Sequence, residues 1–150
     1  MRKIKFRGKS RDDEWVYGSL VIDTDSKYKI VNRGSMLGDV NVIPYTVGQF
    51  TGLHDRNGTE IYEGDLITNT DADITLLKNV DYKIFMFRKD RAAFCTASTV
   101  DLKIMPDFDN WKTLNPTWWA AYGKKYEVMG NIYDNPELLK QKDNDNETEK

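Results

Sequence analysis

The feature that most constrains this chain is the shortness of its apolar segments, each of which ends in turn residues. Segments rich in β-branched and aromatic residues follow one another along most of the sequence, and Gly, Pro, Asn or Asp separates them. This pattern is typical of short antiparallel strands joined by tight connections. It predicts a mainly antiparallel β protein, either a small barrel or a strongly bent sheet.

The N-terminal part of the chain is predicted to start with a β-hairpin. Residues 3–7 alternate between basic and apolar side chains, so Lys3, Lys5 and Arg7 share one side of the strand. This alternation accounts for the basic residues at the start of the chain, so no bound ligand is needed to explain them. Residues 15–22 form the second strand. Shorter strands follow over 27–31, 40–43 and, less clearly because of its glycines, 45–53.

Residues 51–65, TGLHDRNGTEIYEGD, combine the only histidine of the chain with four acids and three glycines. The letters DRNG are typical of a turn, because Asp and Asn bond their own backbone and Gly58 tolerates a positive φ. A second bend is predicted at 63–65. We therefore expect this segment to be a hairpin tip followed by a sharp corner.

The strongest strand pattern of the chain lies in residues 80–98, where two apolar segments flank the turn letters RKDR and predict a second hairpin. Residues 99–105 and 125–133 add further strands. Asn–Pro pairs begin two short helices, one over 115–123 and one over 135–140.

Length and composition favour one soluble domain. The chain has 150 residues, 39% of them hydrophobic, and a formal net charge of −2. A nearly neutral chain has no long-range field to attract polyanions, so strong nonspecific DNA binding is not expected. Cys95 is alone, which fits a reducing cytoplasm, and its place in an apolar strand favours a buried thiol over a nucleophile. No signal peptide or membrane span is predicted.

Three parts of the sequence resemble the YopX protein family, which is encoded by phages and prophages of Gram-positive bacteria. They are IKFRGK near the start, TVGQFTGLHDRNGTEIYEGDLI in the middle and YEVMGNIYDNPELL near the end. The resemblance implies an SH3-like barrel with an additional N-terminal β-hairpin region and two short helices. We expect one unit over 1–139, with its barrel core mostly in 60–135, and a disordered charged tail over 140–150.

The resemblance carries no established activity, cofactor or catalytic residue. It speaks against one catalytic candidate, because family members commonly have lysine where this chain has His54 and Arg56. A catalytic histidine is not normally replaced by lysine. Residues 68–124 match the family least well, so the strands expected there rest on pattern alone.

Two catalytic hypotheses remain weaker than their structural alternatives. His54 and Asp55 resemble an acid–base pair, but neighbours at a loop tip rarely face each other. Glu60, Glu63 and Asp65 offer oxygen ligands for a divalent metal, as in a small metal-dependent hydrolase, but their spacing does not match an EF-hand loop. No nucleotide-binding, serine-hydrolase or zinc-protease motif occurs. We therefore expect no enzyme, no metal and no cofactor.

The sequence offers more residues in support of two binding hypotheses. Aromatic rings lie near the second hairpin tip, at Phe85, Phe87 and Phe94, and cations lie beside them. This combination of rings and cations is typical of proteins that bind single-stranded nucleic acid. These cations are Lys83, Arg88, Lys89 and Arg91. The alternative is a basic turn that ends a core hairpin with its aromatics inside, and the sequence favours it.

Tryptophans in residues 108–119 form the second binding candidate, either as a surface for a protein partner or as a plug at the end of the barrel. They are Trp111, Trp118 and Trp119, and we expect at least two of them to be buried. Our prediction is a phage accessory protein of the bacterial cytoplasm that binds another protein or a second copy of itself.

Overall fold

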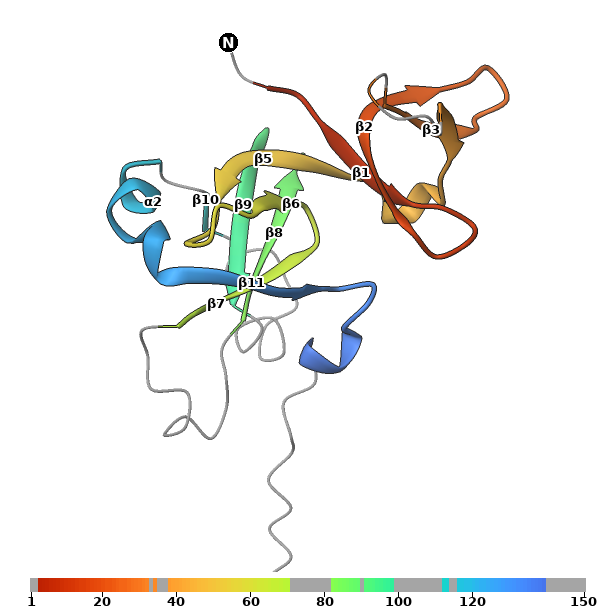
Figure 1. The fold of residues 1–150 in the computed structure, drawn as a ribbon. Coiled ribbons are helices and arrows are strands. Elements are labelled where there is room, and N and C mark those ends of the chain that lie inside the picture. Colours follow the sequence, from red (N-terminus) through yellow and green to blue (C-terminus); the bar gives the residue numbers. More distant parts are fainter. Residues whose placement is uncertain are drawn as a thin grey trace, which may run out of the picture.

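The computed structural model consists of two antiparallel β-sheets and a few short helices (Figure 1). It describes residues 3–32, 34, 38–70, 82–89, 91–98, 112–113 and 116–139.

The first sheet has the strand order β4-β3-β2-β1-β5-β6. Its first hairpin pairs β1 with β2, and Arg7 lies opposite Tyr17 while Lys9 lies opposite Trp15. A 3₁₀ helix, η1 (Pro44–Thr46), separates β4 from β5. The strands are β1 (Phe6–Lys9), β2 (Trp15–Ile22), β3 (Tyr28–Val31), β4 (Asp39–Asn41), β5 (Gly48–His54) and β6 (Glu60–Tyr62).

The second sheet has the strand order β10-β9-β8-β7-β11. Two helices come directly before its edge strand β11, and a 3₁₀ helix, η4 (Pro136–Leu139), follows it. The remaining elements are β7 (Asp65–Asn69), β8 (Lys83–Arg88), β9 (Ala93–Ser98), β10 (Lys112–Thr113), α2 (Pro116–Tyr122), η3 (Gly123–Lys125) and β11 (Tyr126–Asn131).

The described chain forms two lobes. The N-terminal lobe contains β1 to β4 and η1, and the C-terminal lobe contains β5 to β11 with α2, η3 and η4 (Figure 1). The ladder between the lobes is short: Phe6 pairs with Gln49, and Arg7 pairs with Gly48. Most of the contact at this junction is therefore made by side chains.

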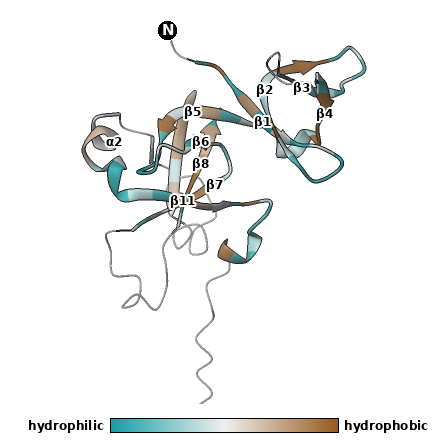
Figure 2. Ribbon diagram, viewed as in Figure 1, coloured by the Kyte–Doolittle hydropathy of each residue, from teal (hydrophilic) through white to brown (hydrophobic). Residues whose placement is uncertain are grey.

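The C-terminal lobe has an apolar cluster on each face of its sheet, because neighbouring residues of β7 and β8 point to opposite faces. Figure 2 shows the apolar run along β8. One cluster contains Ile61, Ile67, Phe85, Trp119 and Tyr126, so β6 and α2 cover that face. The other contains Leu66, Ile84, Cys95 and Ala97, with Leu138 and Leu139 of η4 packed against it.

The prediction of a mainly β protein is confirmed, but the expected closed barrel is wrong for the part of the chain that the structure describes. The outer edge of β11 meets the turn after β5 rather than another strand. The Arg56 amide donates to the Tyr126 carbonyl at 3.0 Å, and the Val128 amide donates to the Asp55 carboxylate at 3.1 Å. Hydrogen bonds from this turn therefore occupy the edge of β11, where strand pairing would be needed to close a barrel.

Most of the predicted elements that fall on described residues are present, with shifted ends. The strand over 15–22 is found as predicted, whereas β1 begins at Phe6 and continues to Lys9. Pro44 begins a 3₁₀ turn over Pro44–Thr46, so the strand expected over 45–53 begins only at Gly48. The last predicted helix is a 3₁₀ turn. The strand expected over 99–105 and the tail over 140–150 lie outside the described residues.

Candidate functional site

The glycine-rich segment 51–65 bends the backbone as predicted. Gly52, Gly58 and Gly64 have φ angles of 88°, 82° and 82°, a region that side-chain-bearing residues rarely adopt. At Gly64 the corner also connects the sheets, because its amide donates to the Phe85 carbonyl at 2.8 Å and its carbonyl accepts from Ile132 at 2.9 Å.

Asp55 and Glu63 use their carboxylates to hold backbone. Asp55 accepts from the amides of Asn57 at 2.8 Å and Thr59 at 2.9 Å, and its other oxygen accepts from β11. Glu63 accepts from the Gln49 amide of β5 and the Phe87 amide of β8, both at 2.8 Å. Each acid therefore ties segments that are distant in the sequence.

His54 lies opposite Glu60 in the β5–β6 ladder, and the carboxylate of the adjacent Asp55 is directed to backbone amides. It is exposed at the end of β5, and its ring packs edge-on against Phe50 with 5.4 Å between the centroids. Within the described ranges, no group of three His, Cys, Asp or Glu side chains is placed to hold a metal ion. The acids of the segment instead accept from backbone amides or pair with cations of residues 3–7.

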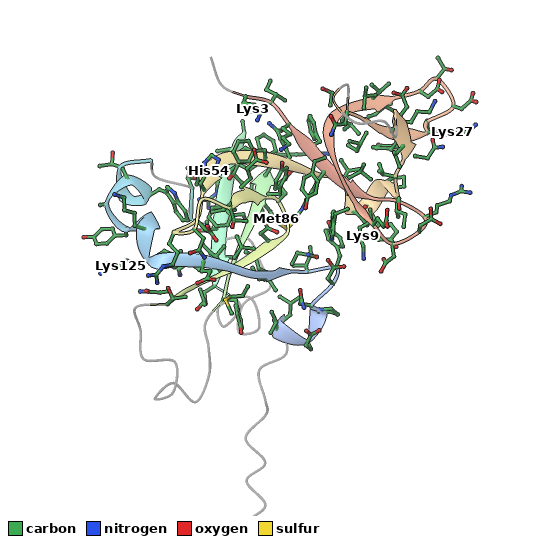
Figure 3. All side chains as sticks on the ribbon, viewed as in Figure 1. Lys3, Lys9, Lys27, His54, Met86 and Lys125 are labelled. Carbon is green, nitrogen blue, oxygen red and sulfur yellow. The ribbon has the colours of Figure 1, made fainter. Side chains whose placement is uncertain are left out.

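Three alternate cations of residues 5–9, one just before β1 and two within it, each pair with an acid of the C-terminal lobe. The Lys5 ammonium lies 2.5 Å from Glu60, the Arg7 guanidinium 2.6 Å from Asp65, and the Lys9 ammonium 2.6 Å from Asp134. We call these three pairs the charge ladder. Figure 3 shows Lys9 at the end of β1, where the lobes meet. The basic side of this segment is therefore paired with acids of the other lobe.

Arg7 is the centre of the charge ladder. Its side chain is 7% exposed and that of Asp65 is 2% exposed. The guanidinium carbon lies 4.5 Å from the Trp15 ring centroid and 5.1 Å from that of Tyr62, so the cation sits between rings of opposite lobes. Its Nη2 also donates to the Glu63 carbonyl at 3.1 Å. Arg7 thus joins β1, β2 and the 63–65 corner.

An open groove with a volume of about 380 Å³ lies over this pair, between the lobes. Both lobes supply its aromatic walls, Trp15 and Tyr17 from β2 and Tyr62 from β6. The complete lining is Arg7, Trp15, Tyr17, Thr59, Glu60, Tyr62, Asp65, Val128, Gly130, Asn131 and Asp134. We call this cavity the inter-lobe groove and treat it as the candidate site.

The charges at the groove are set by burial and by specific partners. Burial opposes ionisation of Asp134, but hydrogen bonds from Lys9, Asn131 and Trp15 outweigh it and lower the pKa of Asp134 to about 2. The pKa of Glu60 is lowered in the same way, because bonds from Lys5 and Tyr62 outweigh burial. Burial raises the pKa of Asp65, and Arg7 opposes that shift. Glu60 and Asp134 therefore remain ionised at neutral pH.

Rings extend from the groove to the surface of the N-terminal lobe. Trp15 donates its indole N–H to Asp134 at 2.6 Å and lies 6.0 Å from Tyr133. Tyr133 lies 6.5 Å from Tyr45, which is 74% exposed. Tyr17 is 37% exposed and contacts Tyr62 edge-on at 5.5 Å. One exposed tyrosine, Tyr17, therefore lines the groove, and a second, Tyr45, is linked to it through Tyr133 and Trp15.

The predicted nucleic-acid cations do not all gather at one place. Lys83 begins β8 and pairs with Ser98, whereas Arg88 ends β8 and pairs with Ala93. Five residues of strand separate them by about 16 Å. Lys89 and Arg91 are exposed in the turn beside Arg88.

The rings of this hairpin divide between the core and the surface. Phe85 is fully buried in the core of the C-terminal lobe. Phe87 is 44% exposed and packs edge-on against Phe94, with 5.5 Å between the centroids. Only Phe87 therefore offers a ring at the surface, close to the cations of the turn.

Of the predicted partner-binding tryptophans, Trp119 is buried. It stacks on Tyr126 with 5.9 Å between the ring centroids and meets Phe85 edge-on at 5.7 Å. Trp119 therefore belongs to the core of the C-terminal lobe. Trp111 and the side chain of Trp118 lie outside the described residues.

Sequence reasoning missed the inter-lobe groove. The alternating cations of β1 were visible, but their partners Asp65 and Asp134 lie 58 and 125 residues from Arg7 and Lys9. The available signal for the groove was a strand with several cations on one face, together with a similar number of acids far away in the sequence. It does not specify which acid meets which cation.

One comparison with known proteins identifies a family. The family profile described as YopX protein matches residues 5–140. The crystal structure of protein EF1440 from Enterococcus faecalis is similar, with a TM-score of 0.56, 23% identity, and coverage of 93% of this chain and 100% of that chain. At this identity the likeness concerns the fold alone. No curated protein matches the chain.

Among the described residues, no helix is both long and apolar enough to cross a membrane.

Proposed function

The chain belongs to the YopX protein family, and on that basis we propose that it is a noncatalytic binding module that acts through contacts with another protein. One observation carries the proposal: the inter-lobe groove has aromatic walls from both lobes, including the exposed Tyr17, and its Trp15 is linked through Tyr133 to the exposed Tyr45. Exposed rings around a partly buried centre are typical of protein–protein interfaces. We include in the proposal an accessory role for a phage in the host cytoplasm.

The chemistry of the segment 51–65 supports a binding role over a catalytic one. The carboxylates of Asp55 and Glu63 accept from backbone amides, and that of Asp65 pairs with Arg7. An acid with these partners stabilises the fold, and moving it to a substrate would break that structure. Calorimetry with Mg²⁺, Mn²⁺ and Ca²⁺ tests the alternative of a metal-dependent hydrolase acting through Glu63 and Asp65.

Affinity capture from nuclease-treated host lysate tests the proposal. The baits are the wild type, the Tyr17→Ala/Tyr45→Ala variant and a matched Ile22→Ala control, which removes a 55% exposed apolar side chain of the same lobe that does not line the groove. We expect one protein to be retained by the wild type and the control, and to fall about tenfold with the double variant. Equal retention by all three baits would refute the proposal.

A second copy of the chain also counts as a partner. Light scattering of the purified protein across a concentration series identifies self-association, and the same Tyr17→Ala/Tyr45→Ala variant should shift the equilibrium toward monomer. A dimer that this variant leaves unchanged would use a different surface.

A second candidate function is single-stranded nucleic-acid binding at the tip of the β8–β9 hairpin. The exposed ring of Phe87 beside Lys89 and Arg91 favours it. Its affinity should fall steeply between low and physiological salt, and Arg88→Ala with Arg91→Ala should flatten that dependence. Binding without salt dependence would exclude this function.

A further inference from the structure

A second open hollow, which adjoins the inter-lobe groove, has cations in its lining and no acid. It has a volume of about 430 Å³ and lies among the residues before β1, the middle of β2 and the end of β3. Among the described residues, Lys3 and Lys5 are its charged lining, and Tyr17 lines both this hollow and the groove. We call this cavity the basic hollow, and Figure 3 shows Lys3 just before β1.

The two lysines of the basic hollow share one carboxylate. The Lys5 ammonium lies 2.5 Å from Glu60 Oε2, and the Lys3 ammonium lies 3.7 Å from Glu60 Oε1. Within the described ranges, neither lysine pairs with a second acid. Two ammonium groups that are held close to one carboxylate repel each other and leave one positive charge uncompensated, so a second carboxylate would be attracted to them.

The other charged side chains on these strands do not cancel this excess. On β3, the Lys29 ammonium is paired with Asp23 at 3.3 Å. On β4, Asp39 lies opposite Val31, but three strand spacings separate β4 from β1 in the sheet. That is about 14 Å, which is longer than the screening distance of about 8 Å at physiological ionic strength. The basic hollow therefore keeps its positive charge.

The surroundings of the basic hollow favour a short acidic stretch over a polyanion. In the adjoining groove, the lining contains three acids, Glu60, Asp65 and Asp134, and one cation, Arg7. A nucleic-acid strand that continued from the hollow into the groove would bring its phosphates to these acids. A protein segment is able to place one carboxylate at the lysines and uncharged groups beyond them.

The basic hollow also offers apolar surface beside its cations. Ile4 lines it and is 66% exposed, and Tyr17 is 37% exposed. An apolar side chain next to the carboxylate of a partner would cover both. The Lys3 side chain is 69% exposed, so it reaches a ligand without a rearrangement of the fold.

We propose that the basic hollow binds an acidic segment of the partner protein. Lys3 and Lys5 donate charge-assisted hydrogen bonds to one carboxylate of this segment, and a neighbouring apolar side chain packs on Ile4 and Tyr17. Because Tyr17 also lines the inter-lobe groove, the hollow extends the same binding surface. This inference rests on the proposed function and gives the partner its chemistry.

Three matched peptides test the charge of the ligand. They are acetyl-Leu-Asp-Leu-amide, which is an anion, acetyl-Leu-Asn-Leu-amide, which has the same shape without the charge, and acetyl-Leu-Lys-Leu-amide, which is a cation. The readout is the NMR signal of the backbone amides of Gly18 and Ser19, which line the hollow. A short oligothymidylate is the probe for nucleic acid.

The acidic peptide should shift both amide signals saturably and bind about threefold or more tighter than the neutral peptide at low salt, and the cationic peptide should bind weakest. The difference between the acidic and the neutral peptide should shrink to less than about twofold in 500 mM salt, because the lysines are open to solvent. The oligothymidylate should bind more weakly than the acidic peptide.

Variants connect this preference to the two lysines. Lys3→Gln should weaken the acidic peptide about threefold, and Lys3→Arg should keep its affinity. The matched control Lys27→Gln removes the same charge from a side chain that is 64% exposed in the same lobe and does not line the hollow, so it should change nothing. Glu60→Gln should tighten the acidic peptide about twofold, because the competing carboxylate is removed.

Three outcomes overturn the inference. They are equal binding of the acidic and neutral peptides, equal effects of Lys3→Gln and Lys27→Gln, and binding of the oligothymidylate that depends on Lys3 and exceeds that of the acidic peptide. If capture from lysate still depends on Tyr17 and Tyr45 in these cases, only the inference fails. If the acidic peptide behaves as expected but capture is independent of Tyr17 and Tyr45, the proposed function fails, and with it the claim that a partner protein supplies the carboxylate.

Discussion

The interior of the C-terminal lobe and the junction between the lobes are both buried, but opposite chemistries fill them. The lobe interior is apolar, with Ile61, Ile67 and Phe85 fully buried. The junction is filled by the charge ladder and by rings that contact its cations. Apolar contacts stabilise one closed arrangement, whereas ion pairs and hydrogen bonds are exchanged for those of water or a ligand when a surface opens. This difference in chemistry is the reason that we propose binding at the junction and not at the lobe interior.

The largest effect is expected for Phe85→Ala in the apolar interior. Phe85 is fully buried and meets Trp119 edge-on, so removing its ring leaves a cavity. We expect a loss of about 3–5 kcal/mol in the free energy of unfolding, measured with urea. The control Phe87→Ala removes a ring that is 44% exposed and should cost about 1 kcal/mol. Similar losses for the two variants would mean that this interior does not dominate stability.

A smaller loss is expected for Asp55→Ala, which tests whether the acid-rich turn is structural. The carboxylate accepts from the amides of Asn57, Thr59 and Val128, and all three lose an acceptor in the variant. We expect about 2 kcal/mol of destabilisation in urea. The control Asp25→Ala lies in another turn and removes only an exposed salt bridge with Lys27, so it should cost less than about 0.5 kcal/mol.

The sequence predicted the backbone role of this turn but not its long-range contacts. The turn letters at 55–58 and the corner at 63–65 require particular residue types for local reasons, and local chemistry is readable from sequence. The contact of Asp55 with Val128 joins residues 73 positions apart. Such contacts depend on how strands are ordered in space, which short patterns do not encode.

The same distinction explains the remaining differences. Alternation along β1 correctly placed Lys5 and Arg7 on one side of the strand, but period-two patterns do not reveal whether that side meets water or another lobe. In β8, Phe85 is fully buried and Phe87 is 44% exposed, although both occupy the same face. Residues on one face differ because β6 and α2 cover only part of it.

The third prediction concerns acid pH at the junction. The pKa of Asp134 is lowered from its ordinary value of 3.8 to about 2 in the folded protein. Its ionised form therefore contributes stability above pH 4, and this contribution is lost as the pH falls toward 2. Because Asp134 is a third exposed, we expect Asp134→Asn to cost about 1 kcal/mol at pH 7.

Urea unfolding of the wild type and Asp134→Asn at pH 7, 4, 3 and 2 measures this effect. The difference between the two proteins should be constant from pH 7 to 5 and close to zero at pH 2. A difference that is unchanged at pH 2 would show that the ionised carboxylate is not its source.

The smallest effect is expected for His54→Ala. The ring is exposed and contacts Phe50 edge-on. We expect a change within about 0.5 kcal/mol in stability and unchanged capture of the partner. Loss of partner capture with normal stability would assign His54 a binding role that the structure does not support.

The most direct test of the account is a double-mutant cycle on the centre of the charge ladder, Arg7 and Asp65. Arg7→Met and Asp65→Leu each leave one buried charge without its partner, so each should lower the free energy of unfolding by about 3 kcal/mol. The protein with both substitutions should lose clearly less than the sum of the single losses, because no unpaired charge remains and only the Tyr62 amide and the Glu63 carbonyl lose a partner. Losses that simply add in the double variant would contradict the claim that paired charges join the two lobes.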